Sequence, residues 1–202
     1  MTVLLLDDRW PDLIPLEAFG RLGGRVEFTD EVPVKVRWNI DTLVAAEGPG
    51  VLVTTNYFDP RVRARVSMGE EVIAASSRRD PIRHAVLAME RACSIGEWEA
   101  SQTHRSLLPY LAEEAQEFAD QVLTWERDGD EQALLRELGD VLLQVLFHAE
   151  LASRRSAFDF ADVAGSFVDK LRSRSPYLFD GTTGVVPVEE QERLWAIGKA
   201  RE

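Results

Sequence analysis

The chain has 202 residues, 45% of them hydrophobic, and a formal net charge of −12. This length and apolar content allow one sizeable hydrophobic core or two smaller ones. The negative charge is concentrated after residue 90, where 21 acidic residues face 12 basic ones, so the composition excludes a protein that follows a nucleic-acid backbone.

The first 85 residues have the pattern of a small α/β domain. Short apolar runs alternate with segments of helical spacing, which is typical of strands and helices that form a partly parallel sheet. The expected strands are residues 3–6, 25–28, 51–55 and 72–75, and the expected helices are residues 13–22 and a segment that begins at Asp59-Pro60. Asp59 is suited to cap that helix, and Pro60 is suited to its first turn.

The apolar run at the N-terminus predicts neither export nor a membrane anchor. It is cut short by Asp7 and Asp8 and has no basic leader, unlike a signal peptide. No stretch approaches the length needed to cross a bilayer. We therefore expect a cytoplasmic protein without a membrane partner. Because Cys93 is the only cysteine, an internal disulfide and a thiolate metal site are excluded, and we expect Cys93 to be a packing residue.

A change of pattern near residues 76–80 separates the chain into two predicted domains. The α/β domain, whose role cannot be read from its residues, occupies residues 1–85, and a mainly helical domain occupies residues 86–202. Residues 81–91 are expected to form a connecting helix.

Two predicted helices form the centre of the second domain. Apolar residues recur at helical spacing from Leu107 to Trp125 and again from Leu134 to Leu146. Between these segments, Gly129 is suited to end a helix and Asp130 to cap the next one. The pattern therefore predicts an antiparallel helical hairpin.

Acidic residues at a spacing of three project from each of these helices. Glu114 and Glu117 form one pair, and Glu137 and Asp140 form the other. No Lys or Arg occurs from residue 106 to residue 126, so the acids of the first helix have no cation one turn away. Four carboxylates directed at one point suit a hard divalent cation, Mg²⁺ or Mn²⁺, rather than zinc or copper.

The competing interpretation is a solvated acidic face. Arg136 lies four residues before Asp140 and offers it an ion-pair partner. Against this interpretation, Gly139 lies inside the second helix, where a glycine costs about 1 kcal/mol relative to alanine. We therefore expect a ligand or another backbone to approach Gly139 closely.

The order of these motifs resembles that of the MazG family of nucleoside triphosphate pyrophosphohydrolases. The resemblance rests on Glu113-Glu114-Ala-Gln-Glu117 followed by Glu137-Leu-Gly-Asp140. It extends from about residue 93 to the end and includes the flanking blocks 98–104, 106–110, 142–149 and 172–179. This chain departs from the family pattern at Glu97, where the family has Pro, and at Ser175 and Tyr177, where it has His.

The resemblance implies a mainly α fold, with a helical MazG-type domain after the small α/β domain. It implies hydrolysis of nucleoside triphosphates to a nucleoside monophosphate and pyrophosphate. The implied substrates are ribo- and deoxynucleotides, including non-standard or oxidised forms, and the implied role is cleaning of the nucleotide pool. Mg²⁺, or Mn²⁺, is the implied cofactor. The implied assembly is a homodimer, which fits the long apolar stripes of the two helices.

The resemblance also implies which residues form the site. The metal ligands are Glu114, Glu117, Glu137 and Asp140, and Glu113 is the candidate to orient or deprotonate the attacking water. The nucleotide contacts are Tyr110, Glu114, Ala133, Leu134, Leu135, Arg136, Asp140, Lys170, Arg174, Trp195, Lys199 and Trp98. Exposed lysines and helix-packing tryptophans are the competing interpretations for Lys170, Lys199, Trp195 and Trp98. His148 is expected to be a packed histidine.

Three other functions remain as alternatives. A di-iron or di-manganese bundle needs Glu-x-x-His pairs, but Asp120 follows Glu117 at that spacing. A phosphoribosyl-ATP pyrophosphohydrolase shares the helical fold, although the lead-in at residues 98–110 favours broad specificity. The third alternative is a regulatory or partner-binding module with a relic metal site.

Overall fold

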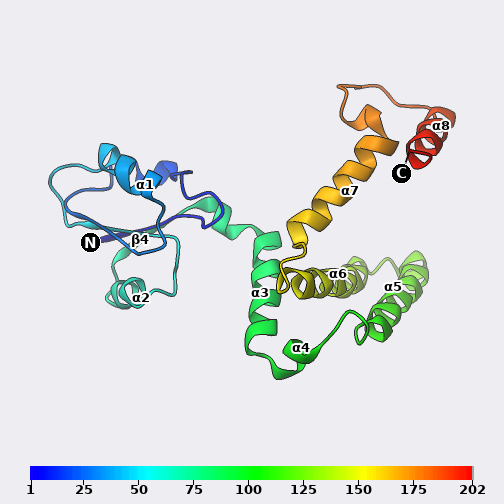
Figure 1. Ribbon diagram of the computed structural model, residues 1–202, viewed down its shortest axis with the longest axis horizontal. Helices are drawn as coiled ribbons and strands as arrows, with labels where there is room; N and C mark the ends of the chain where they lie inside the picture. Colours follow the sequence, from blue (N-terminus) through cyan, green and yellow to red (C-terminus); the bar gives the residue numbers. More distant parts are fainter. Residues whose placement is uncertain (202) are drawn as a thin grey trace. The chain divides into compact units, whose positions relative to one another are not determined.

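The computed structural model describes residues 1–201 and divides into two compact units, Met1–His84 and Ala85–Glu202 (Figure 1). The first unit contains a parallel sheet, and the second is helical. The expected fold class, a mainly helical chain with a small α/β part at its N-terminus, is confirmed.

The sheet of the first unit has four strands in the order β2-β3-β1-β4. The strands are β1 (Thr2–Leu5), β2 (Val26–Phe28), β3 (Val51–Thr54) and β4 (Glu71–Ala74). They lie at the four expected places, but every neighbouring pair is parallel rather than only some of them. The register pairs Leu4 with Val53 and with Ile73 across the centre of the sheet.

Helices cover both faces of this sheet, as a parallel sheet requires. On one face, Leu4 and Val53 pack against Val36 of α1 (Val34–Asn39) and Ile40 of η2 (Ile40–Leu43). On the other face, Val3 and Leu52 pack against Val62 of α2 (Pro60–Ser67). The predicted cap of α2 is confirmed, because the Asp59 side chain accepts a hydrogen bond from the Arg61 amide.

The prediction of a helix over residues 13–22 is wrong. Only a short 3₁₀ turn, η1 (Leu16–Ala18), forms there, between Pro15 and Gly20 with φ of +72°. The positive φ of Gly20 ends helical geometry, so the local backbone outweighs the apolar pattern. The sequence also gave no sign of α1, because six residues are too few to show a helical period.

Among the described residues, six helices follow the sheet, and the first of them begins just before the boundary of the second unit. They are α3 (Pro81–Ile95), α4 (Glu97–Ser101), α5 (Leu108–Asp128), α6 (Glu131–Ser153), α7 (Phe160–Arg174) and α8 (Val188–Lys199). The 3₁₀ turns η3 (Ser76–Arg79) and η4 (Pro176–Leu178) precede α3 and follow α7. In the part of the chain that the structure describes, no helix is both long and apolar enough to cross a membrane.

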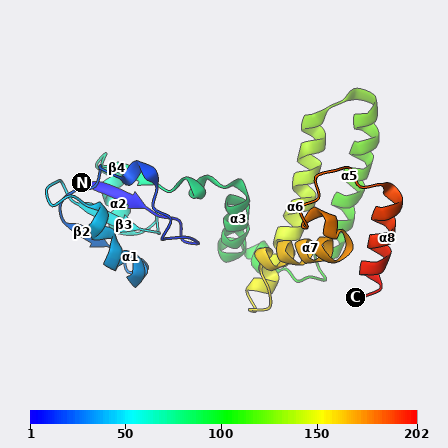
Figure 2. The ribbon, with the colours of Figure 1, turned by 90° about the horizontal axis from the view of Figure 1, so that it is seen from above.

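The predicted hairpin of α5 and α6 is present, with the two helices side by side (Figure 2). Gly129 ends α5 with φ of +70°, and the Asp130 side chain caps α6 by accepting hydrogen bonds from the amides of Gln132 and Ala133. Cys93 is buried in α3 against Met89, so the packing role expected for it is confirmed.

The next pair, α7 and α8, is held together by a close approach of the two backbones. A Cβ atom on Gly198 of α8 would lie 2.5 Å from the Ser173 carbonyl oxygen and 2.8 Å from Cα of Arg174. Only glycine allows this distance. At its other end, α7 begins with a capping box in which Asp159 and Asp162 each accept a hydrogen bond from the other's backbone amide.

Candidate active site on the α5–α6 hairpin

The five acidic residues of the two motifs lie on the facing helices of the hairpin. Glu113, Glu114 and Glu117 belong to α5, and Glu137 and Asp140 belong to α6. Glu114 and Glu137 are partly buried, whereas the other three are exposed. The hairpin therefore brings the two predicted acid pairs to neighbouring helices, as the sequence pattern required.

The charges of these acids act on one another. Partial burial raises the pKa of the Glu114 carboxyl, and four like charges raise it further: those of Asp140, Glu117, Glu113 and Glu137. In residues 1–201 neither an ion pair nor a hydrogen bond joins Arg136 to Asp140, so the ion pair that the competing interpretation needs is not formed. The site thus carries excess negative charge around Glu114.

The donor set fits a hard divalent cation, because every candidate ligand is a carboxylate oxygen and the like charges need a counter-ion. Within residues 1–201, however, no three His, Cys, Asp or Glu side chains converge closely enough to hold a metal ion. The structure therefore brings the four predicted ligands into electrostatic range of one another but not into a ligand shell, and the ligand set stays a prediction.

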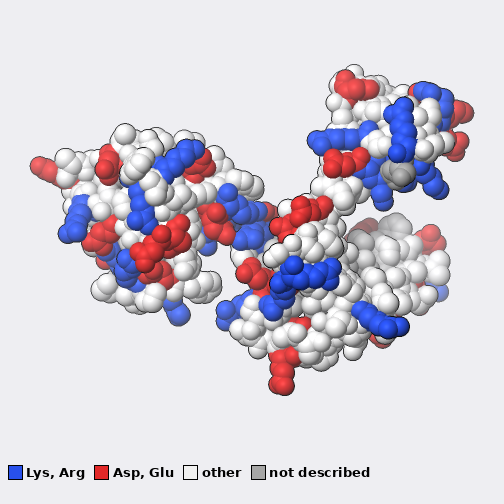
Figure 3. Space-filling model, in the orientation of Figure 1, with Lys and Arg blue, Asp and Glu red and all other residues white. Residues whose placement is uncertain are grey.

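The predicted phosphate and base contacts lie on α7 and α8. The guanidinium carbon of Arg174 lies 5.0 Å from the centre of the Trp195 ring, which is a cation–π contact. Gly198 makes this contact possible by letting α8 approach α7. Lys170 and Lys199 are exposed on the same two helices. Figure 3 shows Lys and Arg side chains gathered on this part of the surface.

Of the remaining predicted contacts, Trp98 lies on α4, Tyr110 lies in the first turn of α5, and residues 133–136 lie near the beginning of α6. Ala133 and Leu134 are partly buried in the first turn of α6, whereas Leu135 and Arg136 are exposed. Trp98 makes edge-to-face contacts with Tyr110, at 5.7 Å between ring centroids, and with Phe147, at 6.0 Å. Trp98 therefore packs against the start of the acidic helix and keeps about half of its surface exposed.

Two predictions about this hairpin concern Gly139 and His148. Outside its own helical turn, no described atom lies within 4 Å of the place where a Cβ of Gly139 would be, so no other backbone of the described chain approaches it, and the approach of a ligand stays a prediction. His148 is partly buried, as expected of a packed histidine, and its Nδ1 lies 2.8 Å from Nδ1 of His104. The predicted antiparallel hairpin could have indicated that His104 and His148 lie close together, because it places the start of α5 beside the end of α6.

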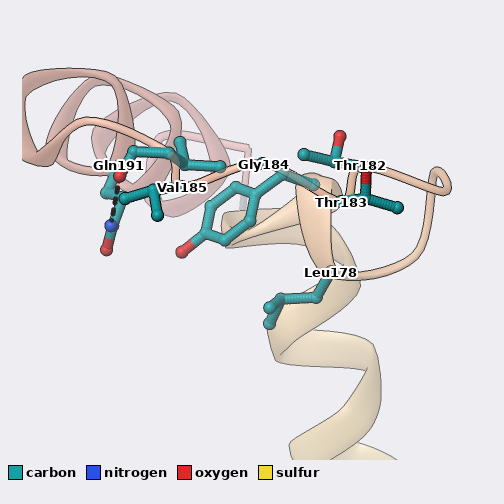
Figure 4. Close-up of a pocket in the computed structure, with 8 residues that line it drawn as sticks. Leu178, Thr182, Thr183, Gly184, Val185 and Gln191 are labelled. Atoms are coloured by element: carbon teal, nitrogen blue, oxygen red, sulfur yellow. Dashed lines mark hydrogen bonds between the residues drawn. The ribbon is translucent and has the colours of Figure 1, made fainter.

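An open hollow of about 300 Å³ lies between η4 and α8 (Figure 4). Its walls are neutral and include the hydroxyl groups of Thr182 and Thr183 and the side chain of Gln191, which donates to the Val186 carbonyl. None of the described acids of α5 and α6 lines it. The hollow is thus separate from the carboxylate site.

Two family models match this chain. Residues 1–73 match the MazG N-terminal domain, and residues 102–179 match the MazG nucleotide pyrophosphohydrolase domain. The second match contains both acidic motifs, His104, His148, Lys170 and Arg174.

Relatives with known names are similar to the chain over its whole length. It is 40% identical to a nucleoside triphosphate pyrophosphohydrolase of Mycolicibacterium smegmatis and 38% identical to one of Mycobacterium tuberculosis, each over 209 aligned residues that include all of this chain. The chain spans only 63% and 62% of the length of these relatives.

A solved structure is similar in fold to part of this chain. The crystal structure of a mazG-related protein from Thermotoga maritima aligns with 58% of this chain and 98% of its own, with a TM-score of 0.50 and 27% sequence identity.

Proposed function

Because the chain belongs to the MazG family, we propose that it hydrolyses nucleoside triphosphates to a nucleoside monophosphate and pyrophosphate. The proposed substrates are ribo- and deoxynucleotides, including non-standard or oxidised forms, and the proposed role is cleaning of the nucleotide pool. The observation that supports this most is the placement of five carboxylates on the two helices of the hairpin, where the charges of four of them raise the pKa of the fifth, Glu114. Such a site can accept a polyphosphate only together with a metal ion.

The proposed cofactor is Mg²⁺, with Mn²⁺ as a substitute. Glu114, Glu117, Glu137 and Asp140 would hold it, since their oxygens are the ligands that these ions prefer. When bound, the cation polarises the α-phosphoryl group and offsets the charge of the phosphate oxygens. The protein's part would be to present the four carboxylates from two neighbouring helices despite their repulsion, so that they could hold the cation beside the nucleotide.

The other proposed roles divide between the two helix pairs. Glu113, exposed beside Glu114, orients or deprotonates the attacking water. Lys170, Arg174 and Lys199 offset the charge of the leaving pyrophosphate, with the planar guanidinium suited to bidentate contact. The face of Trp195 offers a stacking surface for the base.

We expect the protein to work as a homodimer. Apolar side chains on the hairpin are left uncovered within one chain: Leu135 is 60% exposed, Leu138 48% and Leu123 61%. A second copy of the chain would cover them, since large exposed apolar surfaces mark association sites. In analytical ultracentrifugation we expect a dimer, and a monomer at micromolar concentration would contradict this expectation.

The experiment that tests the function is an incubation with a panel of ribo- and deoxynucleoside triphosphates, with and without Mg²⁺, followed by ion-exchange separation of products. We expect monophosphate and pyrophosphate, both lost in EDTA and in Glu117→Gln. Glu126→Gln is the matched control, because this exposed acid lies on α5 outside the acidic motifs.

Other outcomes would replace this function with a stated alternative. Diphosphate and phosphate as products would contradict cleavage between the α and β phosphates. Turnover of phosphoribosyl-ATP alone would favour the alternative of a phosphoribosyl-ATP pyrophosphohydrolase with narrow specificity. If no nucleotide is hydrolysed by a folded protein, the binding module with a relic metal site becomes the better account.

A further inference from the structure

His104 and His148 are bonded to each other by their ring nitrogens. The two Nδ1 atoms are 2.8 Å apart, and the ring planes differ by only 5°. At this distance one Nδ1 must carry a hydrogen and the other a lone pair, because two lone pairs or two N–H groups would repel. The pair therefore contains a directed N–H···N hydrogen bond between opposite tautomers.

In the described part of the chain, this bond is the only polar contact of either ring. The Nε2 atoms of both histidines are buried and have no hydrogen-bond partner. Burying such nitrogens without partners costs stability, whereas an apolar pair of similar size would pack there without that cost. A packing role alone therefore does not explain why two imidazoles occupy this position.

The position of the bond connects it to the acidic residues. The helices α5 and α6 are antiparallel and joined at one end by Gly129 and Asp130. The histidine bond joins them at the opposite end, from the residues just before α5 to the fifth turn of α6. The acids lie between these two connections.

Both histidines are anchored to the segments that carry the acids. On α6, Glu137, Asp140, Gln144 and His148 follow one another at spacings of three and four, so they lie along one face. Gln144 is only 3% exposed, and its Oε1 is buried without a partner, so this polar strip continues from the acids to His148.

On the α5 side, His104 lies inside a closed turn. The backbone amide of Thr103 donates to the Ser106 hydroxyl at 2.9 Å, and the Ser106 amide donates to the Thr103 hydroxyl at 3.1 Å. Leu107, the residue before α5, is fully buried. A shift of the His104 ring would therefore move the first turn of α5, which precedes Glu113 and Glu114.

We propose that the His104–His148 hydrogen bond is a brace that sets the spacing of the α5 and α6 carboxylates and thereby the affinity of the site for its cation. The inference rests on the proposed function. The need for a brace follows from the placement of acidic side chains on both α5 and α6, because like charges on two helices favour their separation when no cation is bound. His104 and His148 are thus positioning residues that do not touch the substrate.

The first test separates the hydrogen bond from packing. In His148→Asn the amide group takes the place of Nδ1 and can still bond to His104, whereas His148→Leu fills the space without a polar atom. We expect the leucine variant to raise the half-saturating Mg²⁺ concentration about 10-fold, as loss of a group that orients metal ligands does, with kcat at saturating Mg²⁺ nearly unchanged. The asparagine variant should recover most of this affinity.

The control is His84→Asn, which removes the one other histidine of the chain from the first unit. It should leave the Mg²⁺ dependence unchanged. Equal effects of the leucine and asparagine variants, or a loss of kcat with an unchanged Mg²⁺ requirement, would overturn the brace.

A second test needs no variant and no turnover. With only three histidines, the ring nitrogens can be assigned by long-range ¹H–¹⁵N correlation in the metal-free protein. We expect one of the two Nδ1 atoms to be protonated and the other not. Two Nε2–H tautomers would overturn the proposal. A protein that has the predicted tautomers and binds Mn²⁺ but hydrolyses no nucleotide would refute the function and leave the brace standing.

Discussion

Asp140 on α6 lies close enough to Glu114 on α5 for its charge to raise the pKa of the Glu114 carboxyl. The two residues are separated by the whole hairpin turn in sequence, and among residues 1–201 no ion pair of either one is formed. The relationship is unfavourable in the metal-free protein, and a bound divalent cation would make it favourable. The proposed cation site accounts for this arrangement, and it stays a proposal because no three of the described acids converge on one metal position.

Removal of the Asp140 charge should lower the pKa of Glu114. In Asp140→Asn without metal, one of the like charges that disfavour ionisation of Glu114 is gone, so we expect this carboxyl to titrate at lower pH than in the unmodified protein. The measurement is a ¹³C NMR titration of the Glu side-chain carboxyls. Glu126→Gln serves as the control, because Glu126 is not among the charges that act on Glu114. An unchanged Glu114 titration in Asp140→Asn would mean that the two residues do not interact.

How far the sequence predicts this site depends on the range of the interactions. The hairpin and its acid pairs follow from local signals, namely helical spacing, Gly129 and Asp130, and these appear as expected. The contact of Arg174 with Trp195 and the bond of His104 to His148 are between residues far apart in the chain. The predicted hairpin brings the two histidine segments near each other, but the side-chain contacts themselves depend on packing that no local pattern encodes.

In the first unit, a local pattern predicts a structure that does not form. Its strands are short apolar runs and were predicted at the right places, whereas residues 13–22 have a helical pattern and yet form only a 3₁₀ turn. Leu16 in that turn is 83% exposed, so its apolar side chain does not belong to the core. Composition alone cannot distinguish an exposed leucine from a buried one.

In this unit, Asp7 should stabilise the fold at neutral pH and cease to do so in acid. Burial would raise its pKa, but hydrogen bonds from Arg9 and Ser77 outweigh this effect and hold the pKa of the Asp7 carboxyl far below its ordinary value. The unfolded chain, with an aspartate pKa of about 3.9, then binds more protons than the folded one in acid. The stabilisation is fully present above that pKa and is lost as the pH falls toward the folded pKa.

The measurement is urea unfolding of Asp7→Asn across a pH series. We expect a loss of about 1–3 kcal/mol at pH 7, where charged hydrogen bonds to Arg9 are removed, and a smaller difference below pH of about 4. Asp41→Asn, an exposed aspartate in the same unit, is the control. A difference between Asp7→Asn and the unmodified protein that does not depend on pH would contradict the role assigned to the charge.

Gly139→Ala should stabilise α6. Glycine inside a helix costs about 1 kcal/mol relative to alanine, and nothing within the chain lies within 4 Å of the added carbon. We therefore expect the free energy of unfolding to rise by up to this amount in chemical denaturation at low protein concentration. Destabilisation instead would reveal a close neighbour supplied by a second copy, and a gain in stability with a loss of nucleotide affinity would place a ligand there.

Gly198→Ala should weaken the packing of α8 on α7. The new Cβ would lie 2.5 Å from the Ser173 carbonyl oxygen and 2.9 Å from Cγ of Arg174, and the contact atoms nearest to it belong to the backbone, which cannot rotate away. Overpacking of this kind costs about 1–3 kcal/mol. Since the displaced helix carries Trp195 and Lys199, we expect KM for the nucleotide to rise while Mg²⁺ binding at the hairpin is unchanged.

Gly165→Ala on α7 provides the matched control for that variant, because the same atom is added to the neighbouring helix where nothing lies within 4 Å. It should leave KM unchanged and slightly raise stability. The contact of Arg174 with Trp195 gives an independent readout, since tryptophan fluorescence should change in Gly198→Ala and not in Gly165→Ala. If both alanine variants raise KM equally, the close approach of α8 to α7 does not position the nucleotide contacts, and Arg174 and Trp195 act independently of each other.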